Sequence, residues 1–160
     1  MIKRILVAVD GSRHADKAVA MAADIASRLN ADLAITHALP QGKLPPELEK
    51  LSSKPVPKMP PMSLGGASVD YQVPAAVLKD IAENLLEKAK RKATDAGVNN
   101  AATSYHGGEA AQVILDAAKA HRADLIVMGS RGLGELKGLM MGSVSHKVQQ
   151  LFEGSVLTVK

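Results

Sequence analysis

The chain has 160 residues, enough for one domain that buries roughly two-thirds of its unfolded surface. Apolar residues make up 46% of it, but aromatic residues only 2%, so its core must be built from Ala, Val, Ile, Leu and Met. The absence of cysteine excludes disulfides, thiolate metal sites and cysteine nucleophiles, and it agrees with a cytoplasmic location. A dispersed net charge of +4, without a dense basic stripe, argues against nucleic acid as a partner. No segment approaches the roughly 18 apolar residues of a membrane span.

The first 39 residues alternate between two hydrophobic patterns. Residues 5–9 form a continuous apolar run, typical of a strand buried on both faces, and the run ends at Asp10-Gly11-Ser12. Apolar residues then recur at helical spacing over 15–29, which predicts a helix. Residues 32–39 predict a second strand.

The pattern is interrupted over residues 40–74, which contain all eight prolines of the chain. Proline removes backbone donors and disfavours helix in the residue before it, so we expect a long surface loop here. A lid or a docking segment for a partner is the functional alternative.

The two patterns resume after the prolines. The expected elements are a helix that starts at Pro74 and is ended by Gly97, a strand over 98–105, a helix over 109–120, a strand over 125–128, a helix over 143–151 and a strand over 156–159. The strand over 98–105 is rich in Ala and Asn, so it suits a sheet edge better than the centre.

This alternation predicts an α/β fold over residues 1–160 as a single domain. Five strands joined by helical connections favour a doubly wound, Rossmann-like parallel sheet with helices on both faces. The strongly apolar first and fourth strands suit the centre, which gives the strand order 3-2-1-4-5. Ligands of such sheets bind outside the carboxyl ends of the strands at the switch point, so the loops after strands one and four form the expected site.

The loop after the fourth strand is rich in glycine. Five glycines fall within residues 129–142, and a helix is expected to begin near Gly142-Ser143. Glycine lets backbone N–H groups approach an anion, and a helix N-terminus favours phosphate. Ser143 is expected to cap this helix, to donate its hydroxyl to phosphate, or both. Arg131 and Lys137 are candidates to pair with phosphate, or are ordinary exposed loop residues.

Two common phosphate-binding patterns are absent from this loop. It has no GxxxxGK[ST] sequence, and Lys137 stands where GxGxxG requires its third glycine. The sequence therefore does not favour a P-loop enzyme or a dehydrogenase.

The spacing of Gly129, Gly132, Gly142 and Ser143 instead resembles the G-2x-G-9x-G-[S/T] motif of the ATP-binding universal stress proteins. The motif follows the strand ADLIVMG, as it does in that family. The resemblance extends from the opening ILVAVDGS to the closing SVLTV, and Ser155 departs from the proline that members often carry there.

The resemblance implies an adenine site near the ends of strands one and two and a phosphate site along the glycine loop. The residues expected to bind the nucleotide are Ala8, Asp10, Ala38, Met128, Gly129, Arg131, Gly132, Gly142, Ser143 and Val144. Asp10 is also a candidate to support Mg²⁺ bound through the nucleotide. Its alternative role is to cap the first helix or to tie down its own turn.

The resemblance further implies a nucleotide-dependent regulator of the stress response. It would bind ATP, or ADP or AMP, with Mg²⁺, form a homodimer through Val156–Val159, and act on an unknown protein partner. No catalytic residue is expected, so any ATPase activity should be weak. The alternatives are a slow ATP hydrolase or adenylate-transferring enzyme, although DGSRHAD does not fit the SGGxDS-like loop of such enzymes, and an interaction module without nucleotide.

Overall fold

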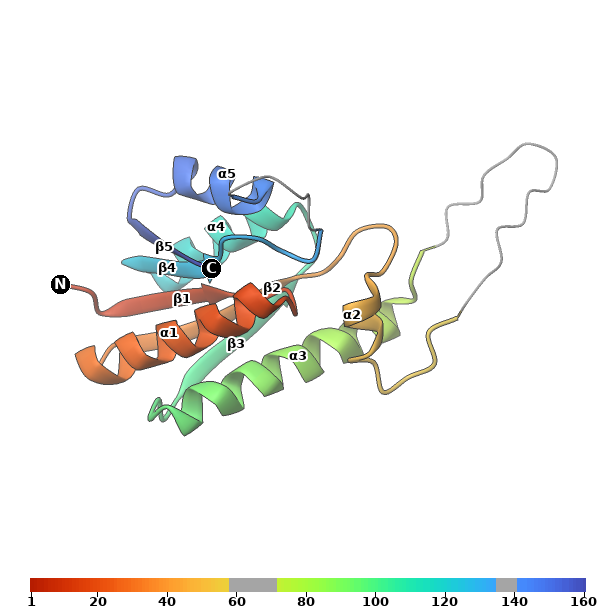
Figure 1. Cartoon of the computed structure of the whole chain (residues 1–160), viewed down its shortest axis with the longest axis horizontal. Helices are drawn as coiled ribbons and strands as arrows, with labels where there is room; N and C mark the ends of the chain where they lie inside the picture. The colour runs from red at the N-terminus through yellow and green to blue at the C-terminus, as the bar shows by residue number, and fades with distance from the viewer. Residues whose placement is uncertain (58–71, 135–140) are drawn as a thin grey trace.

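The computed structural model describes residues 1–57, 72–134 and 141–160, which contain one five-stranded sheet (Figure 1). The strands are β1 (Arg4–Ala8), β2 (Asp32–Ala38), β3 (Ala101–His106), β4 (Leu125–Gly129) and β5 (Ser155–Val159). The helices are α1 (Arg13–Leu29), α2 (Pro46–Glu49), α3 (Ala75–Asp95), α4 (Ala110–His121) and α5 (Ser143–Leu151). All strand pairs are parallel and their order is β3-β2-β1-β4-β5, which confirms the predicted topology.

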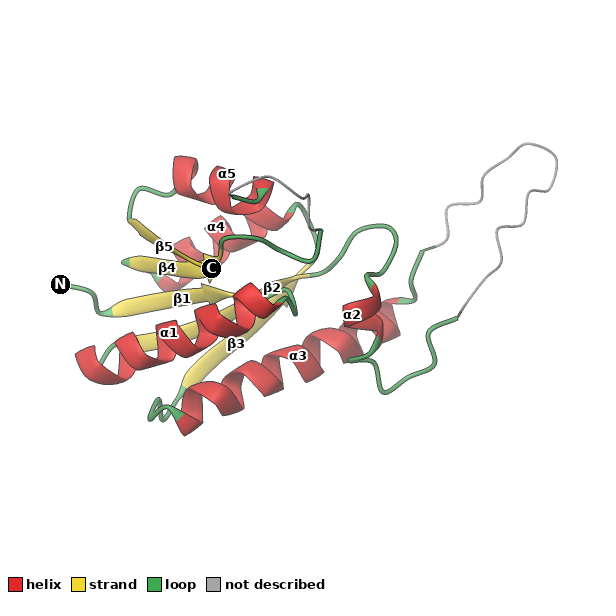
Figure 2. Cartoon of the chain, viewed as in Figure 1, coloured by secondary structure: helices red, strands yellow, loops and turns green. Residues whose placement is uncertain are grey.

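Helices cover both faces of the sheet (Figure 2). Because side chains alternate along a strand, Ile5 and Val7 of β1 pack into the layer of α1 and α3, whereas Leu6 and Ala8 pack into the layer of α4 and α5. The continuous apolar run of β1 is thus explained by two separate cores. Small alanines on the helices let both layers lie close to the sheet.

Local signals in the sequence set several helix ends. The Ser12 hydroxyl accepts a hydrogen bond from the Ala15 N–H at 3.1 Å and caps α1. Gly97 follows α3 with φ +91°, a conformation that favours glycine, so its predicted role in ending this helix is confirmed.

The segment 40–57 is more ordered than the prolines suggested. It contains α2, and its residues Leu44 and Leu48 are 3% and 2% exposed within the core beneath α3. The expectation of a plain surface loop is therefore wrong for this part. Prolines are tolerated in the first turn of a helix, which is where Pro46 lies. Residues 58–71 lie outside the described part of the chain.

The sheet has two edges, β3 and β5, and the predicted edge position of β3 is confirmed. The described helices include none that is both long and apolar enough to cross a membrane.

Candidate functional site

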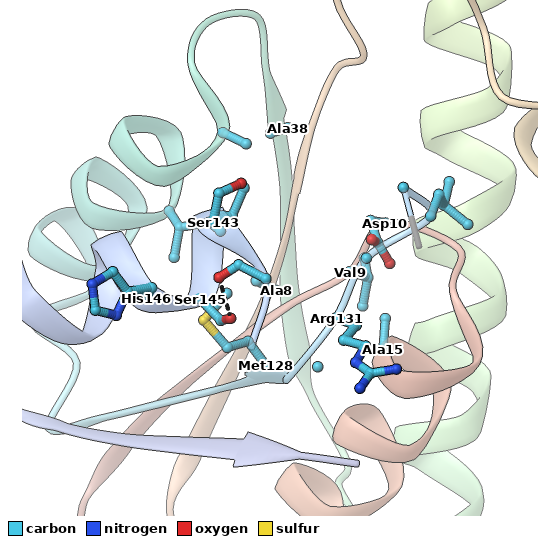
Figure 3. A pocket seen from close by; sticks show the side chains of 18 of the residues that line it. Ala8, Val9, Asp10, Ala15, Ala38, Met128, Arg131, Ser143, Ser145 and His146 are labelled. Atoms are coloured by element: carbon cyan, nitrogen blue, oxygen red, sulfur yellow. Dashed lines mark hydrogen bonds between the residues drawn. The ribbon is translucent and has the colours of Figure 1, made fainter. Parts of the chain in front are cut away.

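A cavity of about 480 Å³ opens at the carboxyl ends of β1 and β4, the switch point of the sheet (Figure 3). Parallel strands all end on this side, and the crossovers from β1 and β4 run to opposite faces, so the loops diverge and leave a space between them. Ala38 from β2 and Ser143 from α5 complete its rim, while Asp10 and Arg131 lie on its other side.

All the residues proposed from the sequence for nucleotide binding line this cavity. They are Ala8, Asp10, Ala38, Met128, Gly129, Arg131, Gly132, Gly142, Ser143 and Val144. Their part in binding a ligand stays a prediction. Lys137 lies outside the described residues.

Asp10 fixes the turn after β1. One carboxylate oxygen accepts a hydrogen bond from the Ser12 N–H at 2.9 Å, which confirms that Asp10 ties down its turn, whereas the cap of α1 is Ser12. The other oxygen, Oδ2, lies 2.6 Å from the position that a Cβ on Gly132 would occupy. A side chain at position 132 would therefore require the Asp10 carboxylate to shift.

Gly129 brings the loop close to α1. A Cβ there would lie 2.8 Å from the Cβ of His14 and 3.0 Å from the backbone nitrogen of Ala15. The first motif glycine thus allows the end of β4 to pack against the first turn of α1. Close packing by itself therefore favours glycine at this position.

The far end of the loop is held by Ser130. Its carbonyl accepts hydrogen bonds from the Gly142 N–H at 2.8 Å and from the buried Ser145 hydroxyl at 3.1 Å. Its hydroxyl lies 3.3 Å from Nδ1 of His14. These contacts bring both ends of the glycine segment, and the start of α5, to the same point at the cavity.

α5 begins without a side-chain cap from the described residues. Gly142 is the N-cap residue and Ser143 is the first residue of the helix, so the expectation that Ser143 caps α5 is wrong. A serine one position past the cap cannot accept from the N–H groups of the first turn in the same way. Among the described residues, no side chain therefore accepts hydrogen bonds from the N–H groups of the first turn of α5. Free N–H groups at the positive end of a helix favour the binding of an anion.

The described lining residues carry few charges. Asp10 supplies a carboxylate, Arg131 a guanidinium and His146 an imidazole, and the rest is mainly backbone and small aliphatic side chains. The described residues contain no group of three His, Cys, Asp or Glu side chains that could hold a metal by themselves. A single carboxylate nevertheless fits Mg²⁺, which is commonly bound by one or two carboxylates together with phosphate and water.

The sequence missed part of the cavity wall. Ala110 and Ile114 come from the inward face of α4, where helical spacing predicted burial but not the end of the cavity. Thr36 comes from β2 and lies beside Ala8, a neighbour that only the strand register reveals. The other lining residues that were not proposed are Val9, Ala15, Leu133, Gly134, Met141, Ser145 and His146.

The fold and the cavity together define a class, the doubly wound α/β proteins with a glycine-rich site at the switch point of the sheet. A model of the universal stress protein family matches residues 1–160, and the chain belongs to this family.

Individual relatives agree with this assignment. The universal stress protein YxiE of Bacillus subtilis is 38% identical, with all of this chain and all of that protein covered. A crystal structure of a universal stress protein in complex with cAMP is 25% identical and has a TM-score of 0.67, with 99% of this chain and 97% of that chain covered. The universal stress protein from Archaeoglobus fulgidus in complex with dAMP is 24% identical and has a TM-score of 0.60 over the full length of both chains.

Proposed function

We propose that this chain binds an adenine nucleotide, ATP with Mg²⁺, in the cavity at the switch point and acts as a nucleotide-dependent regulator of the stress response. The observation that carries the proposal is the start of α5, which receives no side-chain cap from the described residues and lies beside the glycine motif at one wall of a cavity of about 480 Å³. That volume falls within the range of roughly 300–1,000 Å³ usual for small-molecule sites.

The cavity has two chemically different ends. Near the ends of β1 and β2 it is lined by Ala8, Ala38 and the α4 residue Ile114, an apolar surface suited to a flat base. Near β4 it is lined by the motif glycines and the first turn of α5, where backbone N–H groups suit phosphate. We therefore place the base over the β1–β2 end and the phosphates at α5.

The position proposed for the phosphates also indicates where Mg²⁺ would bind. Asp10 is the carboxylate of the described lining, and the absence of a side chain at Gly132 leaves room for its Oδ2. In this proposal Asp10 supports Mg²⁺ that is held mainly by the phosphates, and Arg131 adds a positive charge on the same side.

A binding role is favoured over an enzymatic one. The titratable groups of the described lining are Asp10, Arg131 and His146, and none of them forms a hydrogen-bonded pair of nucleophile and base. The relative in complex with cAMP supports an adenine nucleotide as the ligand class. A cytoplasmic location and a homodimer through β5 belong to the same proposal.

The experiment compares the wild-type chain with Gly132→Val and Gly107→Ala. Each protein is dialysed to equilibrium against ATP and Mg²⁺, and the nucleotide held in excess of the free concentration is released by denaturation and identified by chromatography. Gly132→Val should release almost none, because the new side chain displaces Asp10. Gly107 is an exposed glycine whose added Cβ meets nothing within 4 Å, so Gly107→Ala should carry as much nucleotide as the wild type.

The results of this experiment distinguish nucleotide binding from the enzymatic alternative. A wild-type chain that carries no nucleotide contradicts the proposal, and full retention by Gly132→Val contradicts the site. Rapid accumulation of ADP or AMP during the incubation would favour the enzymatic alternative instead.

A further inference from the structure

Residues 44–54, which include α2, lie against the N-terminal half of α3 (Figure 1). We call this segment the α2 strap. Its side chains Leu44 and Leu48 are buried in the core cluster that also contains Val9, the residue before Asp10. A connection that only crosses the surface would leave such side chains exposed. The strap is therefore a packed part of the structure next to the cavity.

Polar side chains of α3 hold the end of the α2 strap. The Asp80 carboxylate accepts hydrogen bonds from the Ser53 N–H at 2.7 Å and from the Ser53 hydroxyl at 2.6 Å. It also accepts one from the Ser52 hydroxyl at 3.3 Å. The Asn84 side-chain amide donates to the carbonyl of Leu51 at 2.8 Å. Hydrogen bonds to a carboxylate are stronger than those between neutral groups, so Asp80 is the main attachment of the strap to α3.

The α2 strap contacts the turn that carries Asp10. Leu48 Cδ2 lies 3.0 Å from the position that a Cβ on Gly11 would occupy. Leu51 Cδ1 from the strap and Leu85 Cδ1 from α3 lie 3.9 and 4.0 Å from the same position. Gly11 has φ +85°, and because glycine adopts many backbone conformations, a glycine turn keeps one of them only where its surroundings hold it. Three leucines hold this turn from outside the cavity.

The conformation of this turn determines where the Asp10 carboxylate lies. Oδ1 of Asp10 accepts a hydrogen bond from the Ser12 N–H across Gly11, and Oδ2 is the oxygen on the side of the glycine loop. Mg²⁺ requires near-ideal octahedral geometry with ligands at about 2.0–2.1 Å, so a small displacement of a carboxylate weakens metal binding. The apolar end of the cavity, at Ala38 and Ile114, belongs to other elements and does not depend on this turn.

We propose that the α2 strap positions Asp10 for Mg²⁺, with Leu48 and Asp80 as positioning residues. The inference rests on the proposed function. Leu48 packs against the Gly11 turn, and Asp80 attaches the strap to α3. Neither is among the described residues that line the cavity. Loss of either side chain should therefore weaken the contribution of Mg²⁺ to ATP binding and leave the rest of the binding surface in place.

The test is calorimetric titration of the chain with ATP, once with Mg²⁺ and once with EDTA. The ratio of the two dissociation constants is the magnesium enhancement, which we expect to be about tenfold or more for the wild type. Leu48→Ala should reduce the enhancement by about three- to tenfold and change the affinity in EDTA by less than about twofold. Leu48→Met keeps a buried apolar side chain of similar volume and should retain the wild-type enhancement to within about twofold.

A second pair of variants keeps the test decisive if Leu48→Ala does not fold. Asp80→Ala removes the acceptor of three hydrogen bonds from Ser52 and Ser53, and it should reduce the enhancement by about threefold or more. Asp95→Ala makes the same substitution at an exposed residue at the other end of α3, and it should leave both dissociation constants unchanged. Circular dichroism establishes that each variant is folded at the temperature of the titration.

Two results overturn the inference. An unchanged magnesium enhancement in Asp80→Ala, or in folded Leu48→Ala, would show that the strap does not position Asp10. Equal weakening of ATP binding with Mg²⁺ and with EDTA would show that the strap only supports the fold. A wild-type chain that binds ATP equally well in both conditions contradicts the metal role proposed for Asp10, and with it this inference. Absence of ATP binding in both conditions contradicts the proposed function itself, which the first two results leave intact.

Discussion

At the scale of single residues, His37 is an unusual member of the core. It is 1% exposed in β2, its Nδ1 lies 2.8 Å from the carbonyl oxygen of Val9, and its Nε2 is buried with no partner among the described residues. Burial lowers the pKa of His37, against smaller opposite effects of the Val9 hydrogen bond and of the Asp10 charge. The ring is therefore neutral, and its Nδ1–H donates to Val9 at the edge of the cavity.

This environment predicts a loss of stability in weak acid. The unfolded chain protonates His37 near pH 6.5 and the folded chain does so only at lower pH, so the unfolded state binds more protons as the pH falls below about 6.5. The free energy of unfolding should then drop by up to about 1.4 kcal/mol per pH unit over the window in which only the unfolded state is protonated. Urea unfolding at several pH values measures it, and His37→Asn, which keeps a donor without titrating, should show a shallower dependence. Equal slopes would contradict the assignment.

At the scale of elements, α2 supports the cavity from outside. The Leu48 side chain lies 3.0 Å from the position of a Cβ on Gly11, within the turn that carries Asp10. Gly11 has φ +85°, so this turn combines a glycine conformation with a close contact from α2. The packing of a four-residue helix thus bears on the position of Asp10.

Leu48→Ala should lower the free energy of unfolding by about 2–4 kcal/mol, because it removes a buried side chain and leaves a cavity. Leu151→Ala is the matched control, since Leu151 of α5 is 55% exposed and should change stability by less than about 0.5 kcal/mol. Denaturant titration of both variants gives the comparison. If the two changes are equal, α2 is not part of the core.

Some helices and strands could be predicted from the sequence and others could not. Buried strands such as β1 and β4 were predictable because a short, continuous apolar run is typical of a parallel strand that is buried on both faces. α2 was not, because a four-residue helix shows no hydrophobic period and its prolines indicate a loop.

Site residues within the glycine motif could be proposed from their spacing. Thr36 and Ile114 could not, since their place at the cavity depends on strand register and helix packing.

At the scale of the whole molecule, β5 forms one edge of the sheet, and it is the edge through which we propose that two copies pair. Ser155 N–H donates to Asp124 in the strand ladder, and the Val159 carbonyl accepts from Ser130, so these alternate residues face β4. Val156 and Thr158 therefore direct their N–H groups away from β4, to the edge of the sheet. An antiparallel pair of β5 strands about a two-fold axis would use these groups.

Thr158→Pro should convert the dimer that we propose to a monomer, because proline removes an outward N–H group while the ladder to β4 keeps its bonds. Thr158→Val changes the same side chain but keeps that N–H group, so it should remain dimeric. Light scattering of both variants after size-exclusion chromatography gives the masses. A wild-type monomer, or a dimeric Thr158→Pro variant, would contradict pairing through β5.

The central claim is that the cavity at the switch point binds an adenine nucleotide, and titration calorimetry of the wild-type chain with ATP and Mg²⁺ tests it most directly. We expect one site per chain with a dissociation constant of about 1 μM, or roughly −8 kcal/mol. A titration that gives no binding up to about 1 mM ATP, weaker than roughly −4 kcal/mol, would contradict the claim and leave the glycine loop a structural feature.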